Sequence, residues 1–270
     1  MTPTDQIAPV KTGRAPLNGI RMYYEIYGDA AGPPLVLLHG GGSTIEVTYG
    51  QILPFFARHR KVIAVEEQGH GRTTDRDAPV RFTSSADDVA ALLERLEVET
   101  ADIMGFSNGA SVALQLALRH PARVRRLVFA SSMTKRSGAP PQFWQFIDRG
   151  TFADMPQPLK DAFLKVNPDP QQLRAMHDKD LERMQHFVET SDADVSSVRA
   201  PTLVLLGDHD LPTPEHGLEL TRLIPRARLM ILRGGHGDYL GELTQAKKGS
   251  RAPELTAGLI EEFLDDPTDE

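Results

Sequence analysis

The sequence predicts an α/β fold with a mostly parallel central sheet, helices on both faces and one helical insertion. Short apolar runs alternate with amphipathic segments along most of the 270 residues, which is typical of βαβ units. Leu35–Leu38 is a continuous apolar run, as expected for a strand buried on both faces. Residues 133–198 contain no strand-like run and show only short helical patterns. An α/β body interrupted by a helical segment follows from these observations.

The composition excludes several classes of site and partner. A hydrophobic fraction of 40% is enough for a sizeable core, and 270 residues suit one large α/β domain. The net charge of -7 argues against a nucleic-acid-binding surface, which would show basic clustering. Because the chain has no cysteine, disulfides, thiolate nucleophiles and cysteine-ligated metals are excluded.

The sequence also bears on the compartment. MTPTDQIAPVKTGRAPLNG lacks the apolar core of a secretion signal, and no segment has the apolar length of a membrane span. We therefore expect a cytoplasmic protein that binds neither a membrane nor a nucleic acid. The oligomeric state stays open, with a homodimer as one option.

The first half of the chain begins with a β-hairpin signal. Asn18-Gly19 separates two β-rich runs. The apolar strand at Leu35–Leu38 then ends in a histidine and three glycines. Residues 49–60 are predicted to form a helix, residues 61–72 a strand running into a loop, and residues 84–98 a second helix. Ser84 or Ser85 is the expected N-cap of the last of these.

The second half repeats the alternation on both sides of the insertion. A strand in ADIM leads into the turn GFSNGA and a helix that Pro121 ends. VRRLVFASS is the last strand before the insertion. A strand, a helix, a strand and a final helix follow it, over residues 200–210, 214–225, 227–232 and 253–264.

A serine lies between two glycines where the strand pattern changes to a helix pattern. Gly105, Ser107 and Gly109 form G-x-S-x-G, the pattern of a nucleophile elbow that holds a reactive serine in a strained turn. Side chains two residues away on either side would collide, so both positions must be small. The alternative is an ordinary helix N-cap serine. The strand before it, the helix after it and two partners downstream favour the nucleophile.

A serine hydroxyl needs a base within hydrogen-bond reach, and the base needs an orienting acid. His236, between glycines after the last predicted strand, is the expected base. The loop DHDLPTP offers Asp208 and Asp210 as the acid. We prefer Asp210, which lies further into the loop, and expect Asp208 to shape the loop. The alternative is that both carboxylates only cap the following turn.

Attack on a carbonyl creates an oxyanion, which needs preorganised donors. The backbone N–H of Asn108, the residue after the serine, is one expected donor. Gly41 in HGGG is the expected second donor. Gly42 is the second choice and is expected to contact the substrate. A glycine-rich turn without a ligand is the alternative, and His39 is expected to brace the loop.

HGGG, GFSNG, GDHD and GGH together resemble the α/β-hydrolase family, in the chain order Ser107, Asp210, His236. The resemblance spans nearly the whole chain. It implies a core of residues 1–132 and 199–270 and a helical cap of residues 133–198. It also implies that the acid is the last residue of G-x-x-D, which supports Asp210.

The sequence departs from many family members in the loop after the fourth strand. Their D-x-R-G-x-G is replaced by EEQGHGRT, with Glu66 and Gln68 in place of the aspartate and arginine. We expect this loop to be structural and His70 in it to be a bracing residue. A second departure is the long segment GDYLGELTQAKKGSRAP after His236.

With serine at the elbow, the resemblance implies acyl transfer on a small-molecule ester or lactone, with no metal or organic cofactor. Phe143 and Trp144, after a Pro-rich hinge, are the expected substrate contacts in the cap, although packing of the cap is the simpler role for its aromatic residues. Two alternatives stay open. One is other triad chemistry, such as carbon–carbon bond hydrolysis, amide cleavage or perhydrolysis. The other is a small-molecule receptor with vestigial hydrolase activity.

Overall fold

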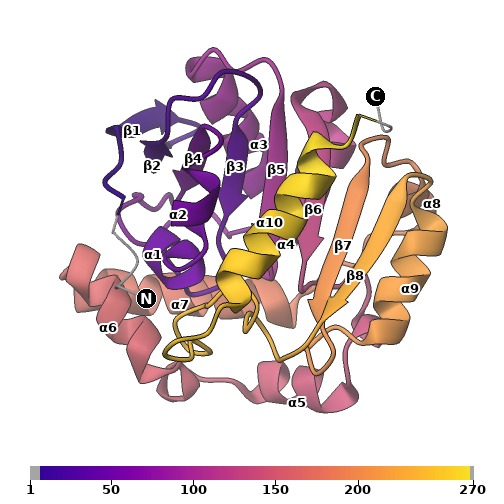
Figure 1. Cartoon of the computed structure of the whole chain (residues 1–270). Coiled ribbons are helices and arrows are strands. Elements are labelled where there is room, and N and C mark those ends of the chain that lie inside the picture. Colours follow the sequence, from indigo (N-terminus) through magenta and orange to yellow (C-terminus); the bar gives the residue numbers. More distant parts are fainter. Residues whose placement is uncertain (1–6, 268–270) are drawn as a thin grey trace.

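The centre of the molecule is a sheet with the strand order β1-β2-β4-β3-β5-β6-β7-β8 (Figure 1). The computed structural model describes residues 7–267, so residues 1–6 of the stretch searched for a secretion signal lie outside it. β2 is antiparallel to β1 and β4, and the other neighbouring strands are parallel. The strands are β1 (Lys11–Leu17), β2 (Ile20–Tyr27), β3 (Leu35–Leu38), β4 (Val62–Val65), β5 (Ala101–Phe106), β6 (Val124–Ala130), β7 (Thr202–Gly207) and β8 (Ala227–Leu232).

Local sequence explains the hairpin and the buried centre of the sheet. Asn18 and Gly19 connect β1 to β2 with φ values of 44° and 84°, the left-handed conformation of a two-residue type I′ turn. β3, β4, β5 and β7 are buried along their whole length, as their continuous apolar runs predict.

Helices cover both faces of the sheet (Figure 1). One face packs against α3 (Phe82–Arg95), α4 (Asn108–Arg119) and α9 (Pro214–Leu223). The other packs against α1 (Ile45–Tyr49), α2 (Leu53–Phe56) and α10 (Ala252–Asp265). A short 3₁₀ turn, η1 (Pro121–Arg123), leads into β6. None of the helices within residues 7–267 is both long and apolar enough to cross a membrane.

The segment between β6 and β7 is helical, which confirms the insertion in the predicted fold class. Its helices α5, α6 and α7 lie below the carboxyl ends of the strands in Figure 1. The segment comprises η2 (Arg136–Gly138), α5 (Pro141–Arg149), η3 (Phe152–Asp154), α6 (Gln157–Val166), α7 (Pro170–Gln185) and α8 (Asp192–Ser196). Val195 and Val198, near its end, pack into the core of the body. The division into residues 1–132, 133–198 and 199–270 stays a prediction.

Two local predictions are wrong. In place of the helix expected over residues 49–60, α1 ends at Tyr49 before Gly50, and only the short α2 follows, with Pro54 in its first turn. α3 begins at Phe82, so neither Ser84 nor Ser85 is its N-cap. The Ser84 hydroxyl donates instead to the Arg81 carbonyl at 3.0 Å, and the Ser85 hydroxyl donates to Glu67 Oε2 at 2.9 Å.

Candidate active site

The turn between β5 and α4 holds Ser107 in a strained conformation, with φ 56° and ψ -123°. A Cβ built on Gly105 would lie 2.1 Å from the Gly109 carbonyl oxygen, and one on Gly109 would lie 2.1 Å from the Leu38 carbonyl oxygen. Any side chain at either position would collide with the backbone, so both positions need glycine. The Ser107 side chain makes no capping hydrogen bond, so the N-cap alternative does not hold.

The structure brings Ser107, His236 and Asp210 into one hydrogen-bonded chain. His236 Nε2 lies 3.1 Å from Ser107 Oγ, and His236 Nδ1 lies 2.7 Å from Asp210 Oδ1. The three residues follow β5, β8 and β7. Because these strands are parallel, their carboxyl ends meet at one edge of the sheet.

Asp210 is held by several donors besides His236. Its Oδ1 accepts from the Leu211 N–H at 2.7 Å, and its Oδ2 accepts from the Gly207 N–H at 3.0 Å and from the Ser131 hydroxyl. Burial alone would raise the pKa of Asp210. Hydrogen bonds from His236, Gly207 and Ser131 outweigh it and hold that pKa below its usual value. Asp210 is therefore ionised at neutral pH, as an acid that orients an imidazole must be.

Asp208 does not reach the histidine. Its Oδ1 accepts a hydrogen bond from the Gly234 N–H at 2.8 Å, which ties the β7 loop to the β8 loop. The structure thus separates the two aspartates of DHD, with one beside His236 and the other bracing the loop.

The predicted oxyanion donors lie at the same edge. Gly41 and Gly42, after β3, and Asn108, at the start of α4, all line the cavity that contains Ser107. Within the described part of the chain, the N–H groups of Gly41 and Asn108 have no acceptor. A Cβ on Gly41 would lie 2.5 Å from Asn108 Nδ2, and Gly42 has φ +62°, so the loop needs glycine at both positions.

His39 and the loop after β4 have bracing contacts. His39 Nδ1 donates to the Gly40 carbonyl at 2.8 Å, and its Nε2 accepts from the Glu67 N–H at 3.1 Å. Glu66 is buried and pairs with Arg72 at 2.6 Å. Gln68 donates to Asp75 at 2.8 Å. The two residues that replace the usual aspartate and arginine are thus part of the loop's own hydrogen bonding.

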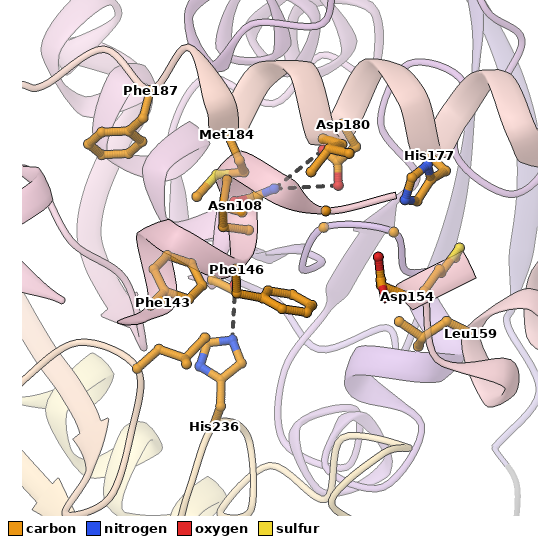
Figure 2. A pocket seen from close by; sticks show the side chains of 18 of the residues that line it. Asn108, Phe143, Phe146, Asp154, Leu159, His177, Asp180, Met184, Phe187 and His236 are labelled. Carbon is orange, nitrogen blue, oxygen red and sulfur yellow. Dashed lines mark hydrogen bonds between the residues drawn. The ribbon is translucent and has the colours of Figure 1, made fainter. Parts of the chain in front are cut away.

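The cavity above Ser107 has a volume of about 300 Å³ and is enclosed by the insertion. One side is apolar, with side chains from α5 and α7 and the loop after α7: Phe143, Phe146, Ile147, Leu181, Met184 and Phe187. Asp154, His177 and Asp180 lie on the other side (Figure 2).

Of the two aromatic substrate contacts predicted, only Phe143 lines the cavity. The expectation for Trp144 is wrong. Trp144 is buried among Met133, Met184 and Phe187, and its indole N–H donates to the Arg136 carbonyl at 2.6 Å. The next residue on a helix is rotated by about 100°, so neighbours on α5 face different surroundings.

Sequence reasoning missed several residues of the site. Ser131, after β6, donates to Asp210 and also hydrogen-bonds Tyr239. Asp180 accepts from Asn108 Nδ2 at 3.3 Å (Figure 2). The sequence signal for Asp180 is only an i,i+3 pair with Arg183 on a polar helix, which reads as a solvent-exposed ion pair. Within residues 7–267, no group of three His, Cys, Asp or Glu side chains is arranged to hold a metal ion.

Residues 33–182 match the family model described as the alpha/beta hydrolase fold. The chain belongs to this family. The family's architecture agrees with the sheet, the elbow and the helical insertion described above.

Relatives in this family carry several activities. The chain is 30% identical to a 2-hydroxymuconate semialdehyde hydrolase from Pseudomonas sp. strain CF600, over 91% of both chains. It is 29% identical to a 2-hydroxy-6-oxo-2,4-heptadienoate hydrolase from Pseudomonas putida strain F1, covering 76% of this chain and 83% of the relative. Among solved structures, Est816, described as an N-acyl homoserine lactone degrading enzyme, has 28% identity, a TM-score of 0.69 and coverage of 91% and 99%. These relatives support hydrolase activity on a small molecule for this α/β-hydrolase.

Proposed function

We propose that this α/β-hydrolase cleaves a carboxylic ester or lactone through an acyl-enzyme on Ser107. The observation that carries the proposal is the chain of hydrogen bonds from Asp210 through His236 to Ser107 Oγ, at 2.7 Å and 3.1 Å, at the floor of a cavity. A serine next to a base that is itself oriented by a carboxylate is the arrangement that nucleophilic acyl transfer needs.

The first half-reaction forms the acyl-enzyme. His236 Nε2 takes the proton of Ser107 as Oγ attacks the carbonyl carbon, and Asp210 stabilises the imidazolium from Nδ1. The N–H groups of Gly41 and Asn108 then hold the oxyanion, and the dipole of α4, a helix of 12 residues, favours negative charge there. His236 returns the proton to the leaving alcohol.

The second half-reaction releases the acid. Water is deprotonated by His236 and attacks the acyl carbonyl, and the same two N–H groups stabilise the second tetrahedral intermediate. A cavity of about 300 Å³ is at the small end of ligand pockets, which favours a small to medium acyl group against Phe143 and Gly42.

A second candidate is other triad chemistry on the same residues. It is favoured by the two relatives named as hydrolases of a semialdehyde and of a dienoate, since neither name contains an ester. A small-molecule receptor with residual hydrolase activity is a third candidate, with no specific contact in its favour.

The test is hydrolysis of p-nitrophenyl esters from acetyl to dodecanoyl, together with lactones of matched size, by the wild type and Ser107→Ala. We expect turnover that falls by about 10⁴-fold or more in the variant, because the nucleophile is lost. Ser111→Ala is the matched control. Its hydroxyl also lines the cavity but hydrogen-bonds Ser132 at 3.0 Å, and its activity should stay within about tenfold of the wild type.

Each contrary outcome points elsewhere. Full activity in Ser107→Ala would refute the mechanism. A single burst without turnover would favour the receptor. Absence of ester and lactone turnover with intact labelling of Ser107 by a fluorophosphonate would favour the other triad reactions.

A further inference from the structure

A carboxylate of the insertion lies directly beside the predicted oxyanion residues. Asp180 of α7 accepts from Asn108 Nδ2, at 3.3 Å to Oδ1 and 3.5 Å to Oδ2 (Figure 2). A Cβ built on Gly41 would lie only 2.6 Å from Asp180 Oδ2. Asp180 therefore lies next to the place where the substrate carbonyl must lie for Ser107 to attack it.

The side chains that hold Asp180 do not face the cavity. Arg183 Nη2 donates to Asp180 Oδ1, and Arg183 Nη1 donates to Glu67 Oε2 at 2.9 Å. Arg183 and Glu67 are buried, and of these three residues only Asp180 lines the cavity. A substrate thus meets the carboxylate and not the guanidinium behind it.

One oxygen of Asp180 has unused capacity to accept hydrogen bonds. Oδ1 is occupied by Arg183 and Asn108. Oδ2 has only long contacts, 3.5 Å to Asn108 Nδ2 and 3.8 Å to His70 Nε2. A carboxylate oxygen can accept about two hydrogen bonds, so Oδ2 can take a donor from the cavity.

The rest of the cavity lining does not offset this negative charge with a strong cation. Of the described residues that line it, none is lysine or arginine, and the other titratable ones are Asp154, His177 and His236. Burial alone would raise the pKa of Asp180, but the nearby charges of Arg183 and His70 hold it well below its usual range. The group facing the substrate is therefore an anion at neutral pH.

We propose that Asp180 is a specificity-determining residue of the serine hydrolase proposed above. It accepts a hydrogen bond from a hydroxyl, amide N–H or ammonium group that the substrate carries close to its reacting carbonyl, and it repels substrates with a carboxylate there. A carboxylate oxygen with room for another hydrogen bond raises the affinity for a substrate that carries a donor and lowers it for one that carries an anion. One group thus both selects some substrates and excludes others. The inference rests on the proposed function, because it needs the substrate carbonyl to lie at Ser107.

Alkylboronic acids test this without turnover. Ser107 Oγ adds to boron and passes its proton to His236, giving a tetrahedral adduct whose substituent lies in the cavity. Inhibition constants would be measured for butyl-, 3-aminopropyl- and 2-carboxyethylboronic acid against ester hydrolysis by the wild type. We expect the inhibition constant of the aminopropyl compound to be lower than that of the carboxyethyl compound by a factor of about ten or more, with the butyl compound between them. Equal constants, or the reverse order, would overturn the role of Asp180.

Two variants on α7 separate Asp180 from the general negative charge of the protein. Asp180→Asn keeps the shape and removes the charge, so the ratio of the two constants should fall toward one. Glu182→Gln makes the same charge change on the same helix, where the side chain is exposed and does not line the cavity, and should leave the ratio unchanged. An equal loss of the ratio in both variants would refute a specific role. Should Asp180→Asn fail to fold, equal inhibition constants or the reverse order in the wild type would still overturn the proposal.

The outcomes also separate the two proposals. If no boronic acid inhibits and Ser107→Ala keeps its activity, the serine mechanism fails and the role of Asp180 fails with it. If all three inhibit equally well, the serine mechanism stands and only the role of Asp180 fails.

Discussion

The histidine–aspartate pairs His236–Asp210 and His70–Asp180 differ in what the histidine can reach. In the first, His236 Nδ1 lies 2.7 Å from Asp210, and the side chain is 25% exposed. In the second, His70 Nε2 lies 3.8 Å from Asp180, and the side chain is fully buried. Only His236 has a serine hydroxyl on its other nitrogen.

The surroundings of His70 explain why the second pair is structural. Its Nδ1 donates to the Gln68 carbonyl at 3.0 Å, and its ring lies 5.0 Å from that of His39. Both ring nitrogens thus face oxygen acceptors, which favours the doubly protonated form. The pair links the loop after β4 to α7. A histidine and an aspartate make a base only where a nucleophile and open space adjoin them.

The largest expected difference between the pairs is in activity. His236→Ala should lower kcat/KM for an ester by about 10³-fold or more, because the base is lost. His70→Gln should stay within about tenfold of the wild type, provided circular dichroism shows that it is folded. An equal loss in folded His70→Gln would make the second pair part of the catalytic machinery and end the distinction.

The acid of the first pair gives the next largest effect. Asp210→Asn should lower kcat by about 10²- to 10⁴-fold, since the amide no longer stabilises the imidazolium. Asp208→Asn is the matched control. It should cost less than about tenfold, because Asp208 contacts only the loop N–H of Gly234. Steady-state kinetics that rank the two variants in the opposite order would assign the acid to Asp208.

The second pair should show its effect in stability. Arg183→Met leaves the buried carboxylates Glu67 and Asp180 without their cation, which should lower the free energy of unfolding by about 3–5 kcal/mol. Arg174→Met on the same helix removes an exposed pair with Asp178 and a contact with the Phe152 ring, and should change the free energy of unfolding by less than about 1 kcal/mol. Urea unfolding measures both, and equal values would mean that burial of the Arg183 pair carries no extra stability.

The smallest expected effect is a pH dependence of the second pair. Burial alone would lower the pKa of His70, but the charge of Asp180, with that of Glu67 adding to it, outweighs burial and raises that pKa despite Arg183. A raised pKa in the folded state stabilises the protein fully below about pH 6.5, the unfolded value, and this stability is lost as pH rises through the folded value. The wild type should therefore lose more stability than His70→Gln between pH 6 and pH 9. Parallel curves from urea unfolding would show that folding does not raise the pKa of His70.

Much of the body was readable from local patterns. The apolar run at Leu35–Leu38 predicted a strand because a strand buried on both faces is apolar almost throughout. Ala101–Phe106 is equally buried although it contains Asp102, whose charge pairs with Arg125 at 2.6 Å. Residues 49–60 do not form the one helix that their apolar periodicity predicts, because Gly50 ends α1 and Pro54 lies in the first turn of α2. In the insertion, the orientation of each helix could not be read, and Trp144 was assigned to the wrong surroundings.

The sequence alone determined the alternation of strands and helices, the need for glycine around Ser107 and the choice of His236 and Asp210 as its candidate partners. Periodicity and steric demand act over a few residues, so a short segment encodes them completely. Packing alone determines that Phe143 and Asp180 line the cavity and that Arg183 is buried. An aspartate three residues before an arginine has the same local pattern on a solvent-exposed helix as on one facing Asn108, 72 residues away. The difference is the desolvation of the pair, which arises only when α7 packs against the turn after β5.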